Sequence, residues 1–97
     1  MNTIPGTFSP IPIELLNTMH FPKQEVLLDT KLIEQRKSIA QTAMKLGNSS
    51  KNKVKIMFED TEGMKIVETT VWGMTDGYLI LKRGIMLPLH CIHKIII

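Results

Sequence analysis

The residues with the clearest chemical potential lie near the end of the chain, in the segment His90-Cys91-Ile92-His93. Imidazole and thiolate groups are good zinc ligands. On one continuing strand Cys91 and His93 would point to one side and His90 to the other, because side chains alternate. No Cys-x-x-Cys or His-x-x-x-His pair lies elsewhere, and only His20 remains as a distant contributor. We therefore expect a structural or turn-capping role, with a metal or small-ligand site near these residues as the weakest alternative.

The other polar residues do not assemble into a catalytic pattern. Glu59, Asp60 and Glu62 cluster where the sequence predicts a hairpin turn. Exposure to solvent at a turn is a sufficient reason for these acidic residues. Cys91 beside a histidine could form a thiolate pair, but no orienting group or oxyanion donor can be named for it. The glycines stand singly instead of forming a phosphate-binding loop. We expect a non-enzymatic protein with no cofactor.

Basic charge is concentrated in one part of the chain. Residues 23–53 carry seven Lys/Arg against three Asp/Glu, whereas residues 54–97 carry five of each. Such an excess is often a solvated helix face, but it can also attract phosphate backbones or acidic proteins. The nucleic-acid-binding candidates are Lys45, Lys51, Lys53, Lys55, Tyr78, Lys82, Arg83, His90 and Lys94.

Two aromatic residues could stack on a base or anchor a partner, namely Trp72 and Tyr78. Trp72 lies in the middle of a predicted strand, so we expect it to be buried beneath the helix. Tyr78 follows directly after a predicted turn, so we expect it to be exposed.

The chain length predicts one domain, preceded by an irregular Pro-rich arm at residues 1–22. The domain spans residues 23–97 and begins with an amphipathic helix at 23–46, where neither Pro nor Gly occurs. Gly47-Asn48 is expected to end this helix. Its apolar face would include Leu28, Leu32, Ile39, Ala40 and Ala43, with Arg36 on the solvent side.

The second half of the chain alternates between apolar and polar residues with a period of two, which is typical of strands. Hairpin turns are predicted at residues 60–63 and at Asp76-Gly77, and Pro88 restricts its strand to an edge or a bulge. Five short strands are too few for a two-sheet sandwich, so we expect closure into a barrel at residues 53–97. The fold class is therefore α+β, mainly β: an N-terminal amphipathic helix followed by a five-stranded antiparallel small barrel.

This order of elements resembles the Sm-like and SH3-like small barrels, including the bacterial RNA chaperone Hfq. The resemblance covers about residues 25–97 and rests on Val54-Lys55-Ile56, the long bent second strand, Leu79-Ile80-Leu81-Lys82 and Leu89-His90. It implies a ring built by edge-strand pairing, with RNA held by basic and stacking residues. The uridine-pocket glutamines of that family have no equivalents here.

A second resemblance is to a set of short bacterial proteins without an assigned activity. It rests on Val67-Glu68-Thr69-Thr70-Val71-Trp72, on Leu81-Lys82 followed by Gly84, and on Pro88 before a closing strand. This resemblance implies the same fold and adds no activity.

The chain ends in Ile95-Ile96-Ile97, and a strand cannot bury three consecutive side chains on one face. An exposed apolar edge invites pairing with another chain, so we expect a homo-oligomer. The N-terminus lacks the regions of a secretory signal and the chain has one cysteine, so we expect a cytoplasmic location and no membrane association. The leading interpretation is an oligomeric small barrel that binds RNA, and the alternative is a protein-interaction or regulatory module.

Overall fold

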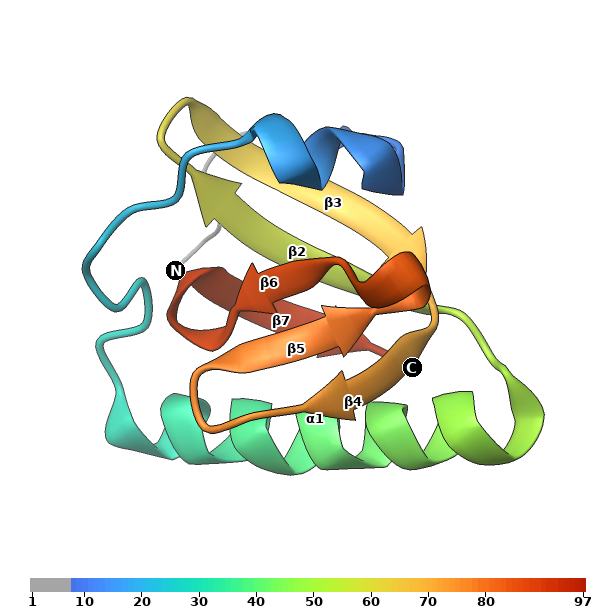
Figure 1. The fold of residues 1–97 in the computed structure, drawn as a ribbon. Coiled ribbons are helices and arrows are strands. Elements are labelled where there is room, and N and C mark those ends of the chain that lie inside the picture. Colours follow the sequence, from blue (N-terminus) through green and yellow to red (C-terminus); the bar gives the residue numbers. More distant parts are fainter. Residues whose placement is uncertain (1–7) are drawn as a thin grey trace.

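The computed structural model describes residues 8–97 (Figure 1). In this part of the chain one long helix, α1 (Thr30–Ser50), accompanies seven strands in two sheets, which confirms an α+β fold made mostly of sheet. The four-stranded sheet has the order β1-β3-β2-β7 and the three-stranded sheet the order β4-β5-β6. The strands are β1 (Ser9–Pro10), β2 (Val54–Asp60), β3 (Gly63–Thr69), β4 (Val71–Met74), β5 (Tyr78–Leu81), β6 (Met86–Pro88) and β7 (Ile92–Ile96). Short 3-10 helices are η1 (Ile13–Thr18), η2 (Lys82–Gly84) and η3 (Leu89–Cys91).

The predicted closed barrel is not what residues 8–97 form, because the strands divide into two sheets. The division falls within the predicted long second strand, where β3 ends at Thr69 and β4 begins at Val71. Between them the carbonyl of Thr70 accepts the N–H of Lys82 at 3.1 Å, outside both ladders. One bent segment therefore passes from the first sheet into the second, while the remaining strands keep their predicted order.

The core lies between the two sheets and α1. Val54, Ile56 and Phe58 of β2 point inward, as their alternation with polar residues predicts. They are joined by the largest buried side chains of the other strands, which are Val67, Val71, Leu79, Leu81, Leu87 and Ile92. Pro88 lies in β6, the outer strand of the three-stranded sheet, which confirms its predicted edge position.

The helix begins later and ends later than predicted. Asp29 is its N-cap, and a carboxylate oxygen of Asp29 accepts the N–H of Lys31 at 2.9 Å. The preceding segment is held in a non-helical conformation, since the N–H of Val26 donates to the carbonyl of His90 at 2.9 Å. The helix then continues through Gly47 to Ser50, so the predicted stop at Gly47-Asn48 was wrong.

The buried face of α1 also differs from the prediction. Leu28, Leu32 and Ile39 were expected inside, but their exposed fractions are 98%, 46% and 37%. The inward face carries Arg36, which was expected on the solvent side but is only 8% exposed, together with Gly47 and, as predicted, Ala40 and Ala43. These small residues allow close packing: a Cβ added at Gly47 would lie 2.0 Å from the carbonyl oxygen of Val71 in β4.

The described part of the N-terminal arm packs against the sheets. Residues Ser9–Pro10 pair in parallel with Lys65–Ile66 of β3, and Leu16 of η1 is buried in the core. Figure 1 shows η1 over β3, on the side of the sheets opposite α1. The first seven residues of the predicted arm lie outside the described part. No helix within residues 8–97 is long and apolar enough to cross a membrane.

Candidate nucleic-acid interface

A concavity of about 680 Å³ lies where the C-terminal end of α1 meets the bend between the two sheets. Three of the predicted binding residues, Lys51, Lys53 and Lys82, line it together. They come from the end of the helix, the loop before β2 and the start of η2. The remaining lining residues are Gly47, Asn48, Thr70 and Trp72.

Trp72 provides the aromatic surface of this concavity. It is 49% exposed, so the prediction that it would be buried beneath the helix was wrong. The register between β4 and β5 shifts at this point, from Val71 opposite Leu81 to Gly73 opposite Ile80. A bulge of this kind changes the direction in which a side chain projects. Because Val71 is buried, alternation already places its neighbour Trp72 on the outer face.

Backbone hydrogen bonds fix the positions of Lys51 and Lys82, two of the lysines that line the concavity with Trp72. Lys51 is the C-cap of α1 in the left-handed conformation, with φ of 56°, and its N–H donates to the carbonyl of Gly47 at 3.1 Å. The hydroxyl of Thr70 donates to the carbonyl of Lys51 at 3.5 Å, while the Thr70 carbonyl accepts the N–H of Lys82. Thr70 therefore links the two basic segments.

The concavity is electropositive. No acidic residue is among its lining residues, and within residues 8–97 none of its three lysines forms an ion pair. The carbonyls at the C-terminal end of a helix carry partial negative charge, which nearby lysines offset. This effect gives Lys51 a structural role, but it does not explain why a tryptophan is exposed among the lysines.

The other predicted binding residues lie elsewhere. Lys55 lines a depression beside residues 10–13, and Lys94 lines a groove between α1 and β7. Arg83 pairs with Glu14 at 3.1 Å on the surface. The structure gives these residues no common surface with the concavity.

The last three candidates are also outside the concavity. Lys45 is exposed on α1. Tyr78 is exposed at the start of β5, as predicted, and stands opposite Pro88 of β6. His90 lines a separate depression that also contains the acid Asp76.

The segment His90-Cys91-Ile92-His93 makes separate structural contacts. The ring Nε2 of His90 lies 2.6 Å from the Pro22 carbonyl oxygen, and that of His93 lies 2.9 Å from a carboxylate oxygen of Glu59. Cys91 is fully buried and its thiol donates to the Pro88 carbonyl at 3.0 Å. Burial raises the pKa of Cys91 to about 12, so it is a thiol and not a thiolate at neutral pH. Within residues 8–97 no three His, Cys, Asp or Glu side chains gather as a metal site.

Asn48 and Thr70 were not among the predicted binding residues, and Trp72 was expected to be buried beneath the helix. Alternation from the apolar Val71 favours an outward Trp72, although Thr69 and Thr70 are both buried and interrupt the alternation just before it. Thr70 is close to Trp72 in the sequence, but nothing local indicates that Asn48 would meet Trp72, because the end of α1 is more than twenty residues away.

Comparison with protein-family models found no match, and comparisons with curated proteins and with solved structures found none either.

Proposed function

We propose that this chain is a non-enzymatic protein that binds single-stranded nucleic acid at the concavity lined by Lys51, Lys53, Trp72 and Lys82. RNA is the leading candidate for this ligand. The observation that supports the proposal is the half-exposed tryptophan among three lysines, in a concavity without acids. Proteins that bind single strands combine a basic groove along the phosphates with aromatic side chains on which bases stack.

A single strand suits this site better than a duplex. In a double helix the base faces are covered by their neighbours, so the indole of Trp72 could contact only edges or backbone. An unpaired base presents a free face to the indole, and its flanking phosphates can reach lysines on both sides. Asn48 and Thr70 add hydrogen-bonding groups in the same lining.

The proposal includes an Sm-like succession of strands, although the two sheets of residues 8–97 do not close into a barrel. The support is topological: if β3 and β4 are counted as one bent strand, the strands follow one another as β7-β2-β3/β4-β5-β6. The second strand of the predicted barrel was expected to be long and bent in this way. The resemblance to the set of short bacterial proteins is consistent with the same arrangement but stays a prediction.

Trp72 is the sole tryptophan of the chain, so its fluorescence reports directly on the proposed site. We expect single-stranded RNA of mixed sequence to quench this fluorescence, and duplex RNA of the same length to bind more weakly. Trp72→Ala should weaken binding by roughly five- to a hundredfold, the range typical of one stacked base, as followed by polarisation of labelled RNA. With three lysines at phosphates, the slope of log K against log salt should be about −2.

Lys82→Ala tests the basic part of the site and should make the slope of log K against log salt less steep by about 0.7. Lys37→Ala is the matched control, because Lys37 is an exposed lysine of α1 that lies outside the concavity. It removes the same charge and should leave the affinity nearly unchanged. Equal losses in both variants would indicate non-specific attraction to net charge, and no salt-dependent binding by the wild type would refute the proposal.

A second candidate function, a protein-interaction module, is favoured by a different surface. The groove between α1 and β7 has apolar walls and a volume of about 720 Å³. Apolar grooves beside a helix and an outer strand are common binding places for polypeptides.

A further inference from the structure

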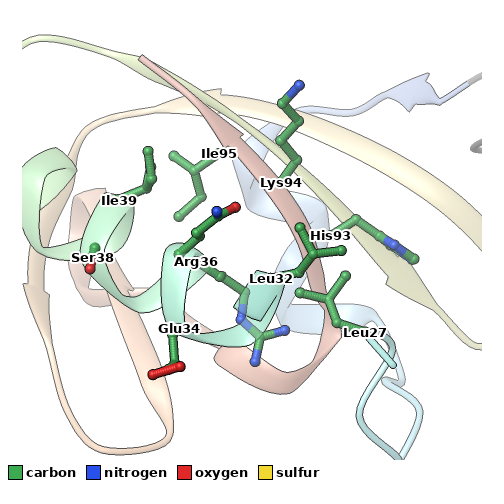
Figure 2. A pocket seen from close by; sticks show the side chains of 10 residues that line it. Leu27, Leu32, Glu34, Arg36, Ser38, Ile39, His93, Lys94 and Ile95 are labelled. Atoms are coloured by element: carbon green, nitrogen blue, oxygen red, sulfur yellow. The ribbon is translucent and has the colours of Figure 1, made fainter. Parts of the chain in front are cut away.

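The groove between α1 and β7 is open and apolar, and it is separate from the basic concavity. Its apolar lining consists of Leu27 before the helix, Leu32 and Ile39 on the flank of α1, and Ile95 of β7. Figure 2 shows these side chains around the space between the helix and the strand. Leu32 and Ile39 are more than one-third exposed, although their spacing on the helix would suit a buried face. Contiguous exposed apolar surface of this kind marks an interaction site.

The strand that forms one wall of the groove is the outer strand of its sheet. Within residues 8–97, β7 pairs with β2 alone. The carbonyl of Ile92, at its start, accepts a hydrogen bond from Nη1 of Arg36 at 2.9 Å. Beyond this point β7 offers an open edge, with exposed Ile96 and Ile97 at its end. Natural proteins usually cover or charge such an edge.

Leu28 is the most exposed large apolar side chain of the described residues, and it belongs to the segment that borders the groove. It is 98% exposed and lies directly after Leu27, which lines the groove. One copy of the chain therefore presents both a protruding apolar side chain and an empty apolar groove beside it. In a pair related by a two-fold axis each surface patch meets its own copy, so the protrusion of one chain can enter the groove of the other.

The charges at the groove also suit a second copy. Two of its ionisable side chains have partners within the chain: Arg36 pairs with Glu25, and the ring of His93 contacts a carboxylate oxygen of Glu59. The other two are an exposed acid, Glu34, and an exposed base, Lys94. Figure 2 shows them on different walls, Glu34 on the helix and Lys94 on β7. In a two-fold dimer with its axis at the groove, the acid of each copy can approach the base of the other and form two equivalent ion pairs.

We infer that the groove is occupied by a second copy of this chain, with Leu28 of each copy inserted beside Leu32 and Ile39 of the other. The dimer needs no other partner and leaves the basic concavity open. It does not depend on the proposed nucleic-acid binding, because the two surfaces share no lining residue.

The test is the oligomeric state of the full chain, measured by sedimentation equilibrium over a wide concentration range. The wild type should be a dimer, and Leu28→Ser should dimerise at least about a hundredfold more weakly, because two leucines leave the interface. Leu15→Ser is the matched control, since Leu15 is another exposed leucine but lies on η1. Neither variant should change the circular dichroism, because both side chains are exposed.

A charge reversal tests how the two copies are oriented, without removing an apolar side chain from the interface. Glu34→Lys and Lys94→Glu should each weaken the dimer, by roughly fivefold, and the double variant should recover the wild-type affinity. A wild type that stays monomeric at high micromolar concentration would overturn the inference, and would leave the groove to an unrelated polypeptide. Equal behaviour of the Leu28 and Leu15 variants, or a double variant no better than the single ones, would place the dimer contact elsewhere and overturn it as well.

Discussion

Replacing Gly47 with alanine should destabilise this protein, although alanine is the better helix former. Gly47 lies in the last turns of α1 and faces β4. A Cβ at this position would lie 2.0 Å from the carbonyl oxygen of Val71 and 3.1 Å from Cγ2 of Thr70. Real Cβ atoms essentially never approach a neighbour closer than 3.0 Å, so helix and strand must separate by about 1 Å. The first of these neighbours is backbone, which cannot rotate away.

The size of the effect follows from two opposing terms. Alanine in a helix is favoured over glycine by about 1 kcal/mol. Overpacking a tight contact costs about 1–3 kcal/mol, and a backbone neighbour puts Gly47 at the upper end of that range. The net loss in the free energy of unfolding should therefore be about 2 kcal/mol. For a domain of this size that corresponds to a fall in Tm of roughly 8–16 °C.

Urea unfolding followed by circular dichroism measures this loss. Gly73→Ala is the matched control, because a Cβ there would lie 3.5 Å from Cδ1 of Ile80, an ordinary contact with the end of a flexible side chain. Gly47→Ala should also weaken the proposed binding of RNA, since it moves α1 away from the bend that carries Thr70 and Trp72. A Gly47→Ala protein as stable as the wild type would refute the close packing of α1 on β4.

Two further predictions concern a partly exposed carboxylate and a buried thiol. A hydrogen bond from Arg36 holds the pKa of Glu25 below its ordinary value of 4.5, so the pair stabilises the fold above about pH 4.5 and less as pH falls through the lower folded value. Glu25→Gln should therefore be less stable than the wild type at neutral pH, with the difference shrinking near pH 3 in urea titrations; a constant difference would contradict the assignment. Cys91, buried and with its pKa raised to about 12, should react with a thiol reagent orders of magnitude more slowly in the native protein than in urea. Rapid labelling of the native protein would show that this part of the core opens.

Much of the strand arrangement could be predicted because its signals are local. Alternation placed Val54, Ile56 and Phe58 inside, and the Asp76-Gly77 turn lies between β4 and β5 as expected. Periodicity could not place the start of α1. The segment before Asp29 looks helical in sequence, but Glu25 is held by Arg36 instead, and this pairing spans eleven residues.

The sequence by itself determined the α+β composition, the succession of the strands that follow α1 along the chain and the edge position of Pro88, since alternation, turn residues and the missing proline N–H act over a few neighbours. Only the tertiary structure decided which side of α1 is buried. The helix approaches β4 through Ala40, Ala43 and Gly47, and this leaves Leu32 and Ile39 in an open groove. The tertiary structure also decided that Lys51, Lys53 and Lys82 line one concavity with Trp72, while the other predicted binding residues lie outside it. The position of the three lysines beside Trp72 depends on contacts between segments that are distant in the sequence. No residue pattern within one of these segments predicts it.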